Sequence, residues 1–249
     1  MEPTIGRARA LNATGFLAFL QGDYDTAQLP LEESLAIRRT LNDRQGIVES
    51  LTNLGLLLRC RGNSAEARPL FEEALAISRA LGDRAWEGRT LNKLARLVFY
   101  EGDHLAARAL HEESLATVRE AGNTWDVAIA LSDLGDISHA LGDDPAARRL
   151  HTESLALWQE LVDERGIAQG LEGLATLAIA ESLPQPAVRL LGAAHAIRAR
   201  ITEPSSPSRR ASLDRLLEAA RAALEVRPRT GHDERGWQPG VLLAARRGS

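Results

Sequence analysis

Residues 51–90 read LTNLGLLLRCRGNSAEARPLFEEALAISRALGDRAWEGRT, and the residue types of this stretch return every forty positions along the chain. Two of the recurring series are Leu11, Leu51, Leu91, Leu131 and Leu171, and Gly22, Gly62, Gly102 and Gly142. A fixed period of about 20 to 50 residues is the signature of a repeat architecture. The chain is therefore predicted to be an array of similar units.

Each unit has the pattern of two helices joined by a turn. Leu51, Leu54 and Leu58 fall on one face at helical spacing. Gly62 is suited to end that helix in the left-handed conformation, and Asn63 with Glu66 forms a capping box for the next helix. The pattern predicts an all-α fold of five helix–turn–helix repeats and a C-terminal capping helix. The expected segments are repeats at 4–41, 44–81, 84–121, 124–161 and 164–201, a capping helix at 207–226, and a disordered basic tail at 227–249.

The L-x-x-L-G … G-[DN] … A … L pattern resembles the tetratricopeptide repeat (TPR) family, although the period is longer than the ~34 residues usual there. The resemblance implies a right-handed superhelix, an α-solenoid whose first helices line a concave, ligand-binding groove. Residues 189–201 (RLLGAAHAIRARI) are similar to the C-terminal end of the helical repeat domain in MalT-like and LuxR-type bacterial regulators. That similarity implies the sensor or interaction arm of a signalling or transcription-regulatory system, either free-standing or excised from a larger regulator.

Composition narrows the location and the class of partner. The chain carries a net charge of −4, and its acidic excess lies before residue 198, so we expect no direct binding of nucleic acid. A single cysteine, Cys60, excludes a disulfide framework and suits a reducing compartment. No stretch approaches the ~20 apolar residues of a membrane-spanning helix. A cytoplasmic protein without membrane contact is expected.

The sequence contains none of the common catalytic or phosphate-binding motifs, so we expect no enzyme activity, cofactor or metal ion. His111 and His151 occupy the repeat position of Phe71 and are predicted to be core histidines rather than ligands. The paired glutamates that recur in the second helices, such as Glu72 and Glu73, are predicted to form a solvated face.

The first helices carry side chains that vary between repeats on the side away from the core. We predict that this face binds a protein or peptide. The candidate groove residues are Phe16, Phe19, Asn53, Arg59, Arg89, Asn92, Lys93, Arg96, Tyr100, Asp133, Asp136 and His139. In the sharpest hypothesis, Arg89, Lys93 and Arg96 receive an acidic group of the ligand. In the alternative, these cations are a solvated face paired with Asp133 and Asp136. A homo-oligomerisation module and a small-molecule effector arm are the rival functions.

Overall fold

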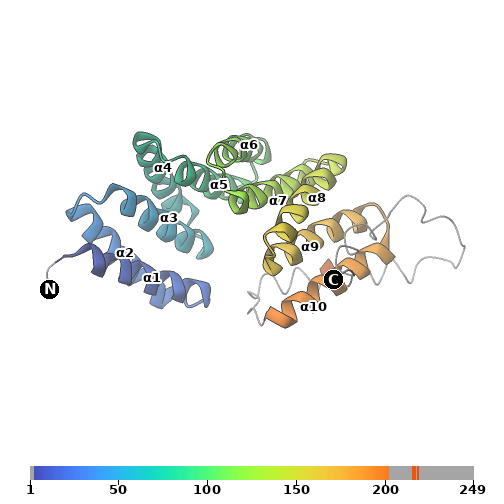
Figure 1. Ribbon diagram of the computed structural model, residues 1–249, viewed down its shortest axis with the longest axis horizontal. Coiled ribbons are helices and arrows are strands. Elements are labelled where there is room, and N and C mark those ends of the chain that lie inside the picture. Colours follow the sequence, from blue (N-terminus) through green and yellow to red (C-terminus); the bar gives the residue numbers. More distant parts are fainter. Residues whose placement is uncertain (1–2, 202–214, 217, 219–249) are drawn as a thin grey trace, which may run out of the picture. The chain divides into compact units, whose positions relative to one another are not determined.

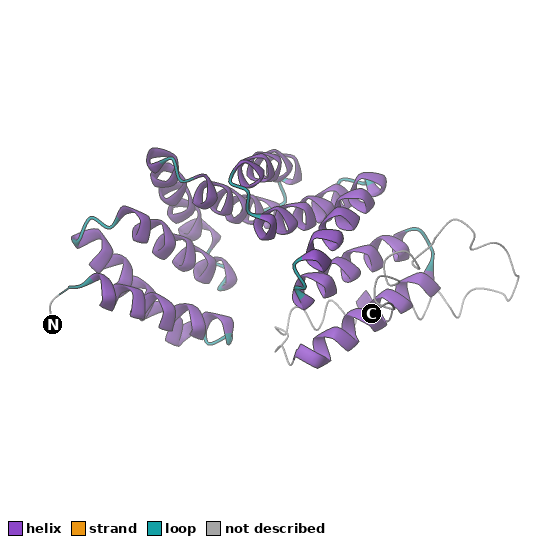
Figure 2. Cartoon of the chain, in the orientation of Figure 1, coloured by secondary structure: helices purple, strands orange, loops and turns teal. Residues whose placement is uncertain are grey.

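The computed structural model describes residues 3–201, 215, 216 and 218, and this part of the chain is helical without a strand (Figures 1 and 2). An all-α fold of five successive helix pairs is therefore confirmed. The helices are α1 (Ile5–Leu20), α2 (Tyr24–Thr40), α3 (Arg44–Cys60), α4 (Ser64–Leu81), α5 (Arg84–Tyr100), α6 (His104–Glu120), α7 (Thr124–Ala140), α8 (Asp144–Glu160), α9 (Glu164–Ala180) and α10 (Pro184–Ile201). None of these helices is long and apolar enough to cross a membrane.

The described residues fall into two compact units, and the boundary lies between Gly166 and Ile167. The first unit contains α1 to α8. The second contains most of α9 together with α10, in which Arg198 donates two hydrogen bonds to the Glu172 carboxylate, at 2.6 and 3.1 Å. The predicted capping helix and basic tail lie outside the described residues, except that Arg215, Leu216 and Glu218 are helical.

Side-chain caps begin most of the helices. Asp43, Asp83 and Asn123 each accept a hydrogen bond from the backbone N–H three residues ahead, at 3.1 to 3.2 Å. The capping box predicted at Asn63 and Glu66 is wrong, because the Asn63 side chain makes no cap hydrogen bond. The Glu66 N–H instead donates to the Asn63 backbone carbonyl at 3.2 Å, so that donor is already satisfied.

The turns need backbone conformations that glycine adopts most easily. Gly62 has a φ of 85° and ends α3 as predicted. Ser182 replaces the turn glycine in the last repeat and adopts a φ of 60°, whereas Val162 adopts 54° in the loop before α9. A β-branched residue in this region is strained, so the loop at Val162 stores conformational energy.

Within the first unit, the two helices of each pair pack against each other, and each second helix packs against the next first helix. The first helices α1, α3, α5 and α7 also contact one another in sequence. Within this unit, no such backbone contact joins one second helix to the next. The first helices therefore form a continuous surface along one side of the unit.

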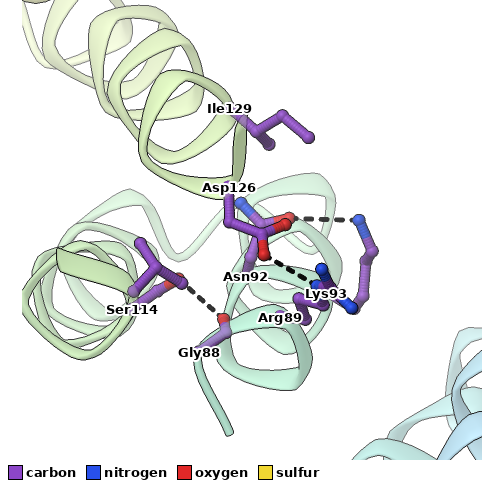
Figure 3. Close-up of a pocket in the computed structure, with 8 residues that line it drawn as sticks. Gly88, Arg89, Asn92, Lys93, Ser114, Asp126 and Ile129 are labelled. Atoms are coloured by element: carbon purple, nitrogen blue, oxygen red, sulfur yellow. Dashed lines mark hydrogen bonds and ion pairs between the residues drawn. The ribbon is translucent and has the colours of Figure 1, made fainter. Parts of the chain in front are cut away.

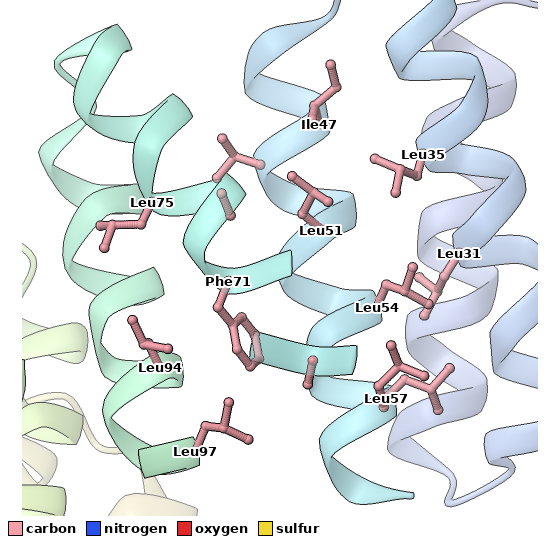
Figure 4. Close-up of a cluster of buried hydrophobic side chains, with 14 of the residues drawn as sticks. Leu31, Leu35, Ile47, Leu51, Leu54, Leu57, Phe71, Leu75, Leu94 and Leu97 are labelled. Atoms are coloured by element: carbon pink, nitrogen blue, oxygen red, sulfur yellow. The ribbon is translucent and has the colours of Figure 1, made fainter. Parts of the chain in front are cut away.

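The core consists of leucine and alanine layers with one large side chain between the two helices of a pair (Figure 4). Phe71 is fully buried against Gly55, where a Cβ atom would come within 2.6 Å of its ring. His151 takes the same place against Gly135, at 2.7 Å, and His111 is also buried. The prediction that these two histidines are core residues is confirmed. Burial lowers the pKa of each to about 4, so both are neutral at pH 7.

The recurring glutamates of the second helices lie on the solvent-accessible surface, in agreement with the predicted solvated face. Glu73, Glu113 and Glu153 also form ion pairs, each with an arginine that lies 34 residues earlier, near the end of the preceding second helix. The pairs are Arg39–Glu73 at 2.7 Å, Arg79–Glu113 at 2.5 Å and Arg119–Glu153 at 2.8 Å. These long side chains bridge the second helices, although each exposed pair contributes little stability by itself.

Candidate functional site

The candidate groove residues lie on the four first helices of unit 1. Phe16 and Phe19 belong to α1, Asn53 and Arg59 to α3, five residues to α5, and the last three to α7. The α5 group is Arg89, Asn92, Lys93, Arg96 and Tyr100, and the α7 group is Asp133, Asp136 and His139. Helix α5 thus contacts α3 and α7, and three of its candidate residues, Arg89, Lys93 and Arg96, are cations.

Arg89 is already paired within the chain. Its Nε lies 2.7 Å from an oxygen of Asp126, a residue of α7 that is only 5 % exposed (Figure 3). The guanidinium carbon also lies 5.5 Å from the centre of the Trp86 ring. The sequence analysis missed Asp126. It compared positions that lie forty residues apart, whereas Asp126 lies 37 residues after Arg89.

Asp133 anchors a second polar cluster between α5 and α7. It is 6 % exposed, accepts a hydrogen bond from the Asn92 amide at 2.7 Å, and lies 3.9 Å from Arg96. Burial acts to raise its pKa, but Arg96, His111, the Asn92 hydrogen bond and Lys93 together lower it below its ordinary value. Asp133 is therefore ionised, and its charge raises the pKa of Arg96 in turn.

Asp136 and His139 also contact α8. An oxygen of Asp136 lies 3.5 Å from the His151 ring nitrogen, and His139 Nδ1 lies 2.6 Å from Asp144. The predicted pairing of the α5 cations with Asp133 holds for Arg96, and the charge of Asp136 also raises the pKa of Arg96. Asp126 is an additional partner, which pairs with Arg89.

Lys93 differs from Arg89 and Arg96, the two candidate arginines of α5, in its contacts. It makes no ion pair within 4 Å among the described residues, and its ammonium group donates one long hydrogen bond, 3.4 Å, to the Asn92 side chain (Figure 3). Its pKa is lowered to about 8, chiefly by burial and also by the charges of Arg96 and Arg59, while the charges of Asp133 and Asp126 act in the opposite direction. Lys93 therefore carries a positive charge at pH 7 that nothing nearby fully compensates.

Arg59 of α3 is the other candidate cation that makes no ion pair with a described residue. Its guanidinium carbon lies 5.4 Å from the centre of the Tyr100 ring, and its terminal nitrogen lies 3.6 Å from the Cys60 sulfur. Its Nε is buried without a hydrogen-bond partner among the described residues. Tyr100 is 63 % exposed, so this stacked pair borders the solvent.

The remaining candidates are engaged inside the chain. Asn53 donates a hydrogen bond at 3.2 Å to the buried Asn12 of α1, which links two first helices. Phe16 stacks on Phe19, and Phe19 on Tyr24, with ring centres 6.0 and 5.8 Å apart. The aromatic strip of α1 is therefore half-buried in the first helix pair.

The hollows of this face differ greatly in size. The space beside Lys93, Asp126 and Ser114 measures only about 10 Å³, about the size of one water molecule (Figure 3). A hollow at α1, α3 and α5 measures about 240 Å³ and is lined by Arg9, Arg38, Asp43, Gln45, Gly46, Glu49 and Trp86. Sequence reasoning did not select Trp86, although it is an aromatic residue one turn before Arg89.

Within the described residues, no group of three His, Cys, Asp or Glu side chains is placed to hold a metal ion. The polar clusters of this face consist of ion pairs and amide hydrogen bonds between α5 and α7.

Comparisons with known proteins agree with this architecture. Family models described as "Tetratricopeptide repeat" match residues 46–120 and residues 127–165. A search of curated proteins found no match.

Among solved structures, BtubC from P. vanneervenii is 22 % identical, with a TM-score of 0.63, over 81 % of this chain and 89 % of that one. A putative kinesin light chain from Podospora anserina with TPR-like repeats is 21 % identical, with a TM-score of 0.59, over 82 % and 100 %. A Rap protein complexed with competence and sporulation factor is 14 % identical, with a TM-score of 0.72, over 88 % and 67 %. These likenesses show a common fold. With the repeat models, they show that the chain contains tetratricopeptide repeats at residues 46–120 and 127–165 and has the fold of proteins built from such repeats.

Proposed function

We propose that this chain is a non-catalytic scaffold whose first-helix face binds an extended segment of a protein or peptide partner. The main support for this proposal is the continuous surface that the first helices form. Four first helices contact in sequence and present polar side chains that differ from one repeat to the next. The hollow of about 240 Å³ at Trp86 and Glu49 has room for a ligand side chain. The Rap protein of the same fold is described as complexed with competence and sporulation factor.

The charges of the face favour a ligand with an acidic group. Asp126 and Asp133 pair with Arg89 and Arg96, which leaves Lys93 as the cation of α5 without an ion pair in the described residues. An anionic group close to Lys93 would relieve that imbalance.

The biological setting is part of the same proposal. The similarity of residues 189–201 to the helical repeats of bacterial regulators supports a sensor or interaction arm of a bacterial signalling or transcription-regulatory system. Such an arm would act in the cytoplasm, where the single cysteine remains reduced.

A peptide-display selection tests the proposal. The chain is used to select binders from a library of random twelve-residue peptides, and the enriched peptides are measured against Lys93→Glu and Arg149→Glu. Arg149 is exposed on α8, a second helix, so its variant has the same charge change away from the proposed face. Arg89 and Arg96 are left unchanged because each neutralises a buried aspartate. Loss of binding in Lys93→Glu alone is expected, and equal binding by both variants would refute this location.

Homo-oligomerisation is the second candidate function, since Leu17 and Leu20 are exposed on α1. Light scattering over a range of protein concentrations decides between the two. A molar mass that stays at the monomer value rejects assembly and leaves the peptide scaffold. A failed peptide selection together with binding of small metabolites would favour the effector-binding arm instead.

A further inference from the structure

We propose that two copies of this chain associate through α1, which packs antiparallel against α1 of the second copy. The contact surface, called here the α1 stripe, runs along the side of the helix opposite its buried residues. It consists of Gly6, Ala10, Ala13, Leu17 and Leu20. The inference rests on the second candidate function, homo-oligomerisation, and does not depend on where a peptide binds.

The α1 stripe is an exposed apolar surface. All of its residues are exposed, and Leu17 and Leu20 leave 58 and 54 % of their surface in contact with solvent. Their spacing alternates between four and three residues, as it does along the contact side of a two-helix coiled coil. The buried residues Ala8, Gly15 and Ala18 lie on the other side of the helix. Helix α1 is therefore apolar on two opposite sides, as expected for a helix that is covered on both.

The same repeat positions are buried in the later first helices of unit 1. The equivalents of Leu17 are Leu57, Leu97 and Ile137, and none of them is more than 2 % exposed. Gly46, the equivalent of Gly6, lies against Arg38 of the preceding second helix, whereas a Cβ atom at Gly6 would meet nothing within 4 Å. Helix α1, the first of the row (Figure 1), thus keeps the residue types of a covered surface although no described residue covers it.

Two residues of the α1 stripe favour a second copy over a further second helix packed as in the other repeats. The equivalents of Leu20 are Cys60, Tyr100 and Ala140, which remain exposed although a second helix precedes each of them. The equivalents of Ala13 are the polar residues Asn53, Lys93 and Asp133. A second helix placed in that way would leave Leu20 in water. The apolar extension to Ala13 and Leu20, found only in α1 among the first helices of unit 1, fits a partner helix that lies along the whole stripe.

The order of side-chain sizes along the stripe favours an antiparallel partner of the same sequence. Alanines precede leucines. When two copies of α1 run antiparallel and cross at the level of Gly15, Ala10 lies opposite Leu20 of the second copy, and Ala13 lies opposite its Leu17. Each layer then combines a small and a large side chain, and the two-fold axis repeats every contact. A parallel pair would instead place leucine against leucine at one end and alanine against alanine at the other.

Charge does not oppose this association. Arg9 is the only charged side chain classed as exposed on α1, and it flanks the stripe. In the antiparallel arrangement the two Arg9 residues lie ~18 Å apart along the helices, which exceeds the screening length of ~8 Å at physiological salt. One pair of 16-residue helices buries little surface, so we expect a weak dimer with a dissociation constant of roughly 1 to 100 µM.

Sedimentation equilibrium at protein concentrations of about 1 to 200 µM tests the interface. The proteins are the wild type, Leu17→Lys and the control Leu105→Lys, with circular dichroism to verify that each variant remains helical. Leu105 of α6 is 72 % exposed, so the control makes the same change at another exposed leucine. We expect dimers of equal affinity for the wild type and the control. Dimerisation of Leu17→Lys should be weaker by at least about tenfold, because each copy loses one leucine from the contact.

Cysteine cross-linking tests the direction of the helices. Cys60, the only cysteine of the chain, is exposed and is first replaced by serine. Chains with Ala13→Cys and chains with Leu17→Cys are then mixed and oxidised, and mass spectrometry identifies the linked peptides. The antiparallel arrangement predicts that links between positions 13 and 17 predominate, whereas a parallel pair would link like positions.

Four results would overturn the inference. A molar mass at the monomer value throughout would reject the second candidate function as well, and would leave the peptide scaffold. A dimer that Leu17→Lys does not weaken would show that the chain assembles through another surface. Equal weakening by Leu17→Lys and Leu105→Lys would show that the effect is not specific to α1. Links between like positions in place of links between 13 and 17 would exclude the antiparallel pair.

Discussion

Replacing Lys93 by methionine is expected to stabilise the fold while it removes ligand binding. Methionine retains most of the aliphatic stem and removes a charge that the folded chain holds unfavourably. The pKa of Lys93 falls from 10.5 to about 8 on folding, mainly through burial. A shift of this size corresponds to about 3 kcal/mol, at 1.4 kcal/mol for each pH unit. Lys93 keeps partial solvent contact, so we expect the variant to gain about 1 to 3 kcal/mol at pH 7.

The dependence on pH identifies the cause. For a base whose pKa is lower in the folded state, the unfolded chain holds more protons between pH 8 and pH 10.5. The stability of the wild type, relative to Lys93→Met, therefore rises across this interval, and the gap closes near the upper end. Urea unfolding of both proteins at pH 7, 8, 9 and 10, monitored by circular dichroism, measures this difference in the free energy of unfolding. The comparison requires that the two proteins have equal m-values.

Two results would refute this reasoning. A gap between the two proteins that stays constant from pH 7 to pH 10 would show that the lysine charge is not the source of the difference. A variant less stable than wild type at pH 7 would show that Asp133 and Asp126 compensate Lys93 fully, and the uncompensated charge on which the ligand argument depends would not exist.

Other substitutions test the packing and the polar clusters, with urea unfolding as the measurement in each case. Asp133→Ala is expected to cost about 3 to 5 kcal/mol because its buried partners lose their acceptor, and a cost below 1 kcal/mol would contradict the cluster. Phe71→Ala should cost about 3 to 5 kcal/mol and Phe71→Leu less than about 1.5, since leucine fills the same place in other repeats. Val162→Gly should stabilise by about 1 kcal/mol by relieving its positive φ, and no gain would exclude strain there. Asp83→Ala should cost about 1 kcal/mol, whereas Asn63→Ala should be nearly neutral because it makes no side-chain cap; equal costs would contradict this difference.

The repeats could be predicted because the chain provides its own comparison. The helix starts, turns and core layers recur after forty residues. A local preference for a helix or a turn that is weak in one repeat is therefore a clear signal when it occurs in several repeats. The long ion pairs were missed for the same reason. Arg79 and Glu113 lie 34 residues apart, and Arg89 and Asp126 lie 37 apart, so positions forty apart do not align them. Asn63 was misjudged because capping preference does not show which acceptor the Glu66 N–H will choose.

The groove residues depend on packing at the repeat junctions as well as on a ligand. The sizes of the side chains vary at two positions across these junctions, one near the end of a second helix and one near the start of the next first helix. The combinations, in chain order, are Arg38 with Gly46, Ser78 with Trp86, Val118 with Asp126, and Trp158 with Gly166. A Cβ atom at either glycine would collide with the large side chain opposite. Where the second helix supplies only a serine, the first helix supplies the indole, which packs against the core and also lines the hollow beside Glu49. The Trp86 indole that fills this junction therefore also lies on the candidate face, where the centre of its ring is 5.5 Å from the Arg89 guanidinium carbon. Variation along the groove is therefore partly dictated by how the repeats fit together, and the lysine that no packing requirement explains is the stronger indication of a ligand.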